Sequence, residues 1–283
     1  MTGPTSRTAL VTGCSSGIGR ATALHLHRAG LIVYATARQP DTIADLADAG
    51  IHTLALDVTD EASMVAAVKR IATDDGQVDV LVNNAGFELV GAAEEIPVSE
   101  VRRQFDTNVF GLARLTQLVL PGMRAQRSGR IVNVSSIFGR FAVPGWAYYA
   151  ATKHAVEAFS EALRLELAGF GIQVVQVEPF AARTRLDTNA VGADDRADGP
   201  YAKFHQEMAR YRAKTWAGPP YNLAGRLAVS ADDVARVITR AATSGRPRAR
   251  YPVGVLARGL FLLRRWLPAR GFDAFVRRQF PVP

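Results

Sequence analysis

The chain has almost no cysteine: Cys14 is the one thiol in 283 residues. A single cysteine excludes an internal disulfide, and a small side chain that fits its turn explains Cys14 more simply than redox chemistry does. The segment before the first predicted strand is polar and only eight residues long, so we expect no signal peptide. The apolar stretch near the C-terminus is interrupted by arginines and falls short of the roughly 20 apolar residues of a membrane span. These features fit a cytoplasmic protein.

Lysine is also scarce, with four residues against 30 arginines. One of the four, Lys153, follows Tyr149 by four positions, and Ser136 precedes that tyrosine by thirteen. Positions i and i+4 share one face of a helix, so the spacing places an ammonium beside a phenol whose ordinary pKa is about 10. A nearby cation lowers such a pKa, and an oxidised nicotinamide would add a second positive charge. The triplet predicts proton transfer by Tyr149 at a carbonyl oxygen that Ser136 holds, although a Tyr-x-x-x-Lys pair alone is more often a surface helix pair.

A glycine-rich turn follows the apolar run of residues 9–11. It reads Thr-Gly-Cys-Ser-Ser-Gly-Ile-Gly over residues 12–19, and a helical pattern covers residues 21–29. Glycines allow positive φ and a close backbone approach, and a helix N-terminus offers N–H groups to a phosphate. Strand, turn and helix together predict a dinucleotide site, with Gly-x-x-x-Gly-x-Gly spacing in place of the common G-x-G-x-x-G.

Apolar segments rich in β-branched residues alternate with helical patterns along the chain. The predicted strands are residues 9–12, 32–36, 53–56, 80–82, 130–134, 173–177 and 250–253. The predicted helices begin near Ile18, Thr42, Asp60, Ser99 and Ala147. Such alternation predicts an α/β fold with a single doubly wound, Rossmann-type parallel sheet of about seven strands and helices on both faces. Because no repeat or linker divides the chain, we expect one domain over residues 1–283.

These motifs, with residues 83–86 (Asn-Asn-Ala-Gly) and Asn108, resemble the short-chain dehydrogenase/reductase family over residues 8–184. The resemblance implies that Tyr149 is the general acid/base and that Ser136 polarises the substrate oxygen. Lys153 would lower the pKa of the tyrosine and bind the nicotinamide ribose, while Asn108 would organise a water between the lysine and solvent. The implied cofactor-binding residues are Gly13, Ser15, Ser16, Gly17, Ile18, Gly19, Arg38, Asp57, Val58, Asn84, Ala85, Gly86, Tyr149, Lys153, Pro179 and Thr184. No metal is expected.

The end of the second predicted strand indicates which nicotinamide cofactor is used. NAD enzymes place an acidic residue there, and NADP enzymes a basic one near the 2′-phosphate. Here no carboxylate occurs before Asp41, and Arg38 is placed to pair with a phosphate dianion. We therefore favour NADP(H). NAD(H) remains the alternative, because Ser16 stands where many NADP-preferring relatives carry a basic residue and Arg38 could be a solvated loop residue. At Asp57, a helix cap before a helix over residues 59–72 is the alternative to an adenine contact.

Aromatic residues favour a lipophilic substrate. Phe180 stands where the family usually has glycine, so it either narrows the substrate mouth or packs against it. The resemblance implies a substrate lid over residues 185–228, in which we assign His205 no role. The aromatic residues of the lid, the apolar C-terminal residues and Phe180, Phe138, Phe141 and Trp146 together favour a lipophilic substrate. The resemblance is closest to family members acting on steroids, retinoids or similar ketones and alcohols.

The formal net charge of +8 belongs to the C-terminal extension, residues 246–283, which holds nine arginines and one acid, Asp273. Leucines at 256, 260, 263 and 267 share one helical face, with Arg258 and Arg265 on the other. This amphipathic helix could lie on an anionic membrane surface, roof an apolar pocket or contact another subunit. We expect no nucleic-acid binding, because no recognition motif accompanies the charge.

The sequence therefore predicts an NADP(H)-dependent oxidoreductase that interconverts a lipophilic carbonyl and a secondary alcohol. By analogy with the family we expect a homodimer or homotetramer, paired through helices near residues 101–127 and 149–169. Two alternatives stay open: a non-catalytic NADP(H)-binding sensor or scaffold, and a component of the membrane surface that acts through its C-terminal extension.

Overall fold

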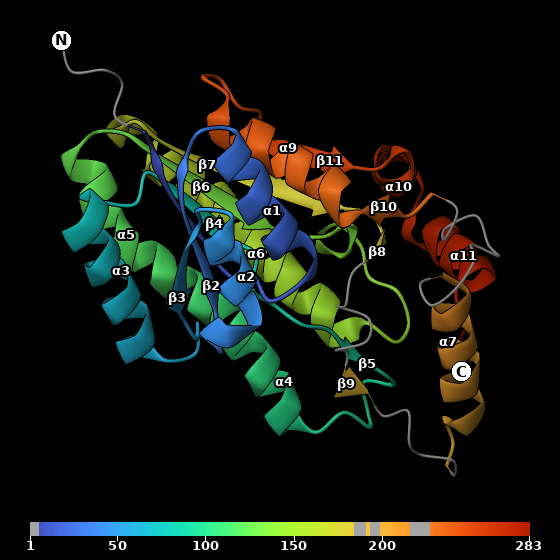
Figure 1. The fold of residues 1–283 in the computed structure, drawn as a ribbon. Coiled ribbons are helices and arrows are strands. Elements are labelled where there is room, and N and C mark those ends of the chain that lie inside the picture. The colour runs from blue at the N-terminus through green and yellow to red at the C-terminus, as the bar shows by residue number, and fades with distance from the viewer. Residues whose placement is uncertain (1–5, 184–190, 193–198, 216–226) are drawn as a thin grey trace.

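A seven-stranded parallel sheet forms the centre of the computed structural model, which describes residues 6–183, 191–192, 199–215 and 227–283 (Figure 1). Its strands are β1 (Thr8–Val11), β2 (Ile32–Ala37), β3 (His52–Ala55), β4 (Val80–Asn83), β6 (Gly129–Val134), β7 (Ile172–Pro179) and β11 (Arg250–Val253). Their order is β11-β7-β6-β4-β1-β2-β3. The direction in which the strands are added to the sheet reverses between β1 and β4. All seven predicted strands are confirmed.

Helices connect the strands and continue beyond them. They are α1 (Gly17–Arg28), α2 (Ala44–Asp48), α3 (Glu61–Asp75), α4 (Val98–Phe105), α5 (Leu112–Ala125), α6 (Ala147–Glu166), α7 (Ala202–Thr215), α9 (Ala231–Thr243), α10 (Val255–Trp266) and α11 (Ala269–Gln279). Shorter elements are η1 (Pro40–Ile43), η2 (Asp106–Gly111), η3 (Ile137–Gly139), η4 (Ala168–Phe170), and the paired strands β5 (Leu89–Val90) with β9 (Val191–Gly192) and β8 (Ala182–Arg183) with β10 (Val229–Ser230). The predicted starts near 18, 60, 99 and 147 lie within one residue of α1, α3, α4 and α6. Thr42 lies in η1, which leads into α2.

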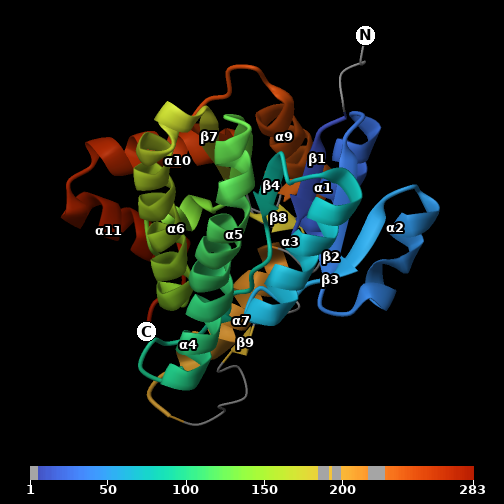
Figure 2. The ribbon, with the colours of Figure 1, turned by 90° about the vertical axis from the view of Figure 1, so that its left-hand side faces the viewer.

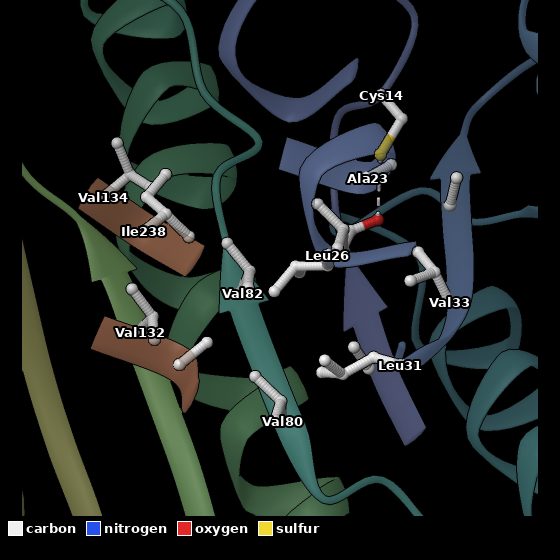
Figure 3. Packing of buried hydrophobic residues seen from close by; sticks show 14 of the residues in the cluster. Cys14, Ala23, Leu26, Leu31, Val33, Val80, Val82, Val132, Val134 and Ile238 are labelled. Carbon is white, nitrogen blue, oxygen red and sulfur yellow. Dashed lines mark hydrogen bonds between the residues drawn. The ribbon is translucent and has the colours of Figure 1, made fainter. Parts of the chain in front are cut away.

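Helices cover both faces of the sheet because strand side chains alternate between the two faces. On one face, Val82 and Val132 pack with Leu26 of α1 and Ile238 of α9 (Figure 3). On the other face lie α3, α5 and α6 (Figure 2), and their side chains pack with strand residues such as Leu10. The thiol of Cys14 lies in the first of these clusters and donates a hydrogen bond to the Val11 carbonyl. Burial raises the pKa of this thiol to about 12, so it stays protonated near neutral pH.

A third apolar cluster lies beside the sheet and joins α7, α10 and α11 to the residues before and within α6. Its members include Trp146, Phe141 and Phe204, and the three helices lie together at the right of Figure 1. The predicted amphipathic helix forms, but it ends at Trp266. Pro268 follows two residues later, and a proline ring cannot continue a helix, so α11 begins anew at Ala269. No helix in the described ranges is long and apolar enough to cross a membrane.

Candidate active site

A cavity of about 970 Å³ opens at the carboxyl ends of the strands, where the order of winding reverses between β1 and β4. Ligands of doubly wound sheets bind at such a switch point. The predicted site residues that line the cavity are Gly13, Ser15, Ser16, Gly17, Ile18, Arg38, Asp57, Val58, Asn84, Ala85, Gly86, Ser136, Tyr149, Lys153 and Pro179. Gly19 and Asn108 are not among the lining residues, and Thr184 lies outside the described residues.

The turn between β1 and α1 has the shape of a phosphate cradle. Gly13 has a φ of +72° and Gly17 a φ of +56°, values that favour glycine. A Cβ at Gly19 would clash with the Gly13 carbonyl oxygen, so the close approach of the helix start to the turn requires glycine there. The first N–H groups of α1 have no partner within the helix, and such groups bind anions. The turn therefore fits the pyrophosphate of a dinucleotide.

Thr12 and Asn84 hold this turn against the end of β4. The hydroxyl of Thr12 accepts 3.0 Å hydrogen bonds from the backbone N–H groups of Asn84 and Ala85. The amide of Asn84 donates to the Thr12 carbonyl at 2.9 Å and to the Gly13 carbonyl at 3.2 Å. These bonds fix the two strand ends that flank the switch point.

Tyr149, Lys153 and Ser136 come together inside the cavity. Tyr149 is 6% exposed, Lys153 7% and Ser136 9%. The Lys153 ammonium lies 5.6 Å from the centre of the Tyr149 ring and donates a 2.8 Å hydrogen bond to the Val134 carbonyl at the end of β6. Ser136 lies close enough to the Tyr149 hydroxyl to lower the pKa of that phenol. Tyr149 and Lys153, four residues apart on α6, thus lie beside Ser136, which follows the end of β6, as the sequence predicts.

The pKa of Tyr149 is shifted in the direction opposite to the sequence expectation. Burial raises it well above its ordinary value, the negative charge of Glu88 raises it further, and the Ser136 hydrogen bond lowers it. Burial also lowers the pKa of Lys153 to about 8, while Glu88 and Glu157 raise it. Desolvation of the buried phenolate therefore dominates among the protein groups, and the lowering of the phenol pKa by Lys153 together with an oxidised nicotinamide stays a prediction.

Asn108 connects the loop after β4 to α6 instead of lining the cavity. It lies in η2, where its Oδ1 accepts from the Phe87 N–H at 3.0 Å and its amide donates to the Phe87 carbonyl at 2.9 Å. The amide also lies 3.2 Å from the hydroxyl of Thr152, which donates in turn to the Tyr149 carbonyl at 2.8 Å. A buried path of hydrogen bonds thus holds the residue that carries the phenol.

Arg38 and Asp57 follow β2 and β3 at the edge of the cavity. Arg38 is exposed and forms no hydrogen bond or ion pair with any other residue that the structure describes. Asp57 accepts from the N–H and hydroxyl of Thr59. The helix-cap alternative for Asp57 is wrong, since α3 begins at Glu61 and its N-cap is Asp60, whose carboxylate accepts from Ala62 N–H.

The other end of the cavity is apolar. Its lining residues include Phe138, Phe141, Phe180, Leu256, Leu260, Leu263, Phe275 and Phe280. Phe180 is 6% exposed and packs against Gly254, whose positive φ lets the chain turn into α10. Phe180 therefore both packs at the base of α10 and lines the cavity.

The region predicted as a lid is described only in part, with α7 as its main element. Phe204 and Met208 of α7 pack into the third apolar cluster. His205, to which the sequence assigned no role, is buried and pairs with Glu95. Most of the remaining lid residues lie outside the described ranges.

Glu88 is a site residue that the sequence did not indicate. It follows residues 83–86 closely, lines the cavity, and accepts a 2.6 Å hydrogen bond from the indole N–H of Trp146. Only the packing of the loop after β4 against α6 brings this carboxylate near Tyr149, so no local pattern reveals it.

The parallel sheet, the glycine turn and the buried Tyr149–Lys153–Ser136 group define a nucleotide-dependent oxidoreductase site. The sequence matches the short chain dehydrogenase family over residues 7–194. The chain belongs to this family, whose members bind NAD(P)(H) and act on small molecules.

Relatives and solved structures extend the similarity over nearly the whole chain. Retinol dehydrogenase 5 of Mus musculus is 32% identical over 96% of this chain and 88% of its own. A 3-ketodihydrosphingosine reductase of Bacteroides thetaiotaomicron is 44% identical over 64% of this chain and 65% of its own. A short-chain dehydrogenase from Streptomyces avermitilis has a TM-score of 0.80 at 34% identity, covering 98% and 96% of the two chains. A serine dehydrogenase complexed with NADP+ has a TM-score of 0.73 at 25% identity, covering 88% and 95%.

Proposed function

We propose that the protein interconverts a lipophilic carbonyl compound and its secondary alcohol with NADP(H). The observation that carries this proposal is the meeting of Tyr149, Lys153 and Ser136 in the cavity that the glycine turn also lines. When bound, the nicotinamide cofactor supplies or accepts the hydride. Tyr149 gives a proton to the substrate oxygen in reduction and takes it back in oxidation, while Ser136 holds that oxygen by a hydrogen bond.

Lys153 makes the phenolate form of Tyr149 accessible. With a pKa of about 8, its ammonium is mostly charged at pH 7. The bond to the Val134 carbonyl keeps that charge within reach of the phenol. The protein groups alone leave the phenol pKa raised, so we infer that the positive charge of the oxidised cofactor is also needed near neutral pH. Asn108 keeps this part of α6 in place through Thr152.

Arg38 supports NADP(H) over NAD(H). It lies just after β2, at the edge of the cavity, with its guanidinium unpaired among the described residues. A guanidinium there suits a 2′-phosphate through charge-assisted hydrogen bonds, whereas no carboxylate lies at this position for a ribose hydroxyl. The likeness to a serine dehydrogenase complexed with NADP+ agrees.

The apolar end of the cavity supports a lipophilic substrate. Phenylalanines and leucines from four separate segments line it, and burying apolar substrate surface against them contributes roughly 25 cal/mol per Å². Two relatives are named for retinol and 3-ketodihydrosphingosine. A hydrophobic alcohol or ketone therefore suits this cavity better than a small polar one.

The two faces of α10 support two roles for this helix. One face covers the cavity, and the other is suited to contact a membrane surface. Leu256, Leu260 and Leu263 line the cavity, while Val255, Leu262 and Trp266 are 79%, 59% and 77% exposed. Exposed arginines, Arg258 and Arg265, lie beside the outward residues. An apolar stripe with tryptophan and flanking arginines suits an anionic membrane surface. If this outward face contacted a membrane, α10, which covers the cavity, would lie against the bilayer surface.

Exposed apolar residues on other helices support self-association. Phe110 in η2 is 60% exposed and Leu165 of α6 is 69% exposed. Both lie in or next to the helices through which the family resemblance implies pairing. We infer a homodimer or homotetramer in which these residues are covered.

A substrate panel tests the proposed function. Ketones and secondary alcohols from small polar to sterol-sized would be mixed with enzyme and NADPH or NADP+, and the nicotinamide absorbance followed. We expect turnover that rises with the apolar size of the substrate. If the protein binds the nucleotide but turns over none of the substrates with either cofactor form, a non-catalytic sensor or scaffold would be favoured over an enzyme.

A further inference from the structure

The helix that covers the cavity, α10, is held to the rest of the protein by few buried side chains. Of its twelve residues, only Ala257 is buried. Leu256, Leu260 and Leu263 line the cavity, so part of their apolar surface is open to whatever fills that space. The position of α10 therefore depends strongly on contacts elsewhere on the helix.

Arg140 makes one of these contacts. It directly follows η3, the short helix that begins after Ser136. Its guanidinium carbon lies 5.4 Å from the centre of the Phe261 ring on α10, within the distance of a cation–π interaction. Phe261 is half-buried and packs against the third apolar cluster. Arg140 thus joins the loop that carries Ser136 to helix α10.

A buried carboxylate on β7 fixes the same guanidinium. Nη1 of Arg140 lies 3.5 Å from Oε1 of Glu178, whose side chain is 1% exposed. Arg250 lies 3.4 Å from this oxygen, which accepts no hydrogen bond from any residue that the structure describes. Glu178 directly precedes Pro179 and Phe180, which line the cavity. Arg140 therefore connects α10 to two walls of the site, the loop after β6 and the end of β7.

A helix held in this way affects some substrates more than others. If α10 covers the cavity only part of the time, the apparent affinity of a substrate that needs the covered state falls with the covered fraction. This loss applies to substrates long enough to contact the leucines of α10. A small ketone that occupies only the end beside Tyr149 and Ser136 would lose little.

We propose that Arg140 is a positioning residue that holds α10 over the cavity and thereby determines the preference for long apolar substrates. This inference rests on the proposed function and identifies a residue that sets the specificity of the same site. Arg140 does not line the cavity, and it acts through Phe261 and Glu178.

The test compares the longest and the shortest secondary alcohol that the enzyme oxidises with NADP+, with secondary dodecanol and secondary butanol as first choices. Arg140→Met keeps an apolar stem but removes the charge. It should raise KM for the long alcohol by roughly three- to thirtyfold, the usual strength of a cation–π contact. The kcat for that alcohol and the KM for the short one should stay near their wild-type values.

Three further variants separate this contact from a general effect on folding. Arg140→Lys keeps a cation and should recover part of the affinity for the long alcohol. Phe261→Leu removes the ring and should also raise this KM, and the double variant Arg140→Met, Phe261→Leu should be little worse than Arg140→Met alone, because both changes remove one interaction. Arg124→Met changes an exposed arginine of α5 that does not line the cavity and should alter neither KM.

Hydrogen exchange in the free protein measures the same contact without a substrate. Arg140→Met should speed the exchange of backbone amides in α10, because local opening of this helix becomes easier. The amides of α5 should exchange as they do in the wild type.

The outcomes distinguish the inference from the proposed function. If Arg140→Met keeps the wild-type KM for the long alcohol, or raises both KM values equally, the inference is wrong and the proposed function stands. Unchanged exchange in α10 would also overturn it. If the wild-type enzyme oxidises no alcohol and reduces no ketone of the panel, the proposed function is wrong and the specificity role falls with it, while exchange in α10 still shows whether Arg140 holds the helix.

Discussion

The ammonium of Lys153 donates a 2.8 Å hydrogen bond to the carbonyl oxygen of Val134. This bond ties α6 to the last residue of β6, so Tyr149 and Lys153 are fixed relative to the carboxyl edge of the sheet. Ser136 follows that strand by two residues, and the same geometry brings its hydroxyl to Tyr149. The chemistry of the site therefore depends on the packing of one helix against one strand.

Replacing Tyr149 with phenylalanine should abolish turnover, because phenylalanine has no hydroxyl to exchange the proton with the substrate oxygen. A loss of at least about 100-fold in kcat is expected for removal of a general acid/base. NADPH affinity, measured by calorimetry, should change by less than about threefold, since phenylalanine keeps the ring and its packing.

Tyr148→Phe is the matched control for this prediction. Tyr148 is adjacent on α6, but its hydroxyl donates to the Ala93 carbonyl outside the cavity. The control should keep near wild-type kcat. Equal activity in Tyr149→Phe and wild type would remove Tyr149 from the mechanism.

Replacing Arg38 with alanine should weaken NADPH far more than NADH. Only NADPH carries the 2′-phosphate that the guanidinium can bind, and hydrogen bonds to charged groups contribute about 1.5–3 kcal/mol, or roughly 10- to 100-fold in Kd. Titration of both nucleotides with both proteins measures the difference. Arg28→Ala, at the exposed end of α1 and away from the cavity, should change neither affinity. Equal losses for NADPH and NADH would contradict the assignment.

Local patterns were sufficient to predict the sheet and the proximity of Tyr149 to Lys153. Each strand has a short β-branched segment, and Tyr149 and Lys153 are related by helical spacing alone, so neither needs knowledge of distant contacts. The shift in the Tyr149 pKa could not be predicted in this way. It depends on how deeply the phenol is buried and on Glu88, which only tertiary packing brings close. The break between α10 and α11 was available in the sequence, since Pro268 marks it.

The outward stripe of α10 should bind anionic vesicles. Wild-type protein should co-sediment with vesicles containing phosphatidylserine and be released by high salt, because the flanking arginines are exposed and such attraction is screened. The double variant Leu262→Ser, Trp266→Ser should lose most of this binding. Val98→Ser removes an equally exposed apolar side chain from α4 and should bind as wild type does. Equal binding by both variants and wild type would exclude this surface.

The buried pair Glu157 and Glu178 should make stability depend on pH. Burial and, to a smaller extent, the neighbouring charge of Glu157 raise the pKa of Glu178 from an ordinary 4.5 to about 7, against the lowering effects of Arg140 and Arg250. The folded state therefore holds this proton more tightly than the unfolded state does. Its contribution to stability is full below pH 4.5 and is lost as the pH rises towards 7.

Glu178→Gln should remove this part of the decline, since glutamine does not titrate. Relative to wild type, the variant should gain up to about 3 kcal/mol in free energy of unfolding between pH 4.5 and pH 8, measured by urea denaturation at several pH values. Some decline should remain, because burial also raises the pKa of Glu157. Glu161→Gln changes the exposed partner of Arg250 and should keep the wild-type slope. If Glu178→Gln follows the wild-type curve, the carboxyl is ionised in the folded protein across this range, and Arg140 and Arg250 compensate for its burial.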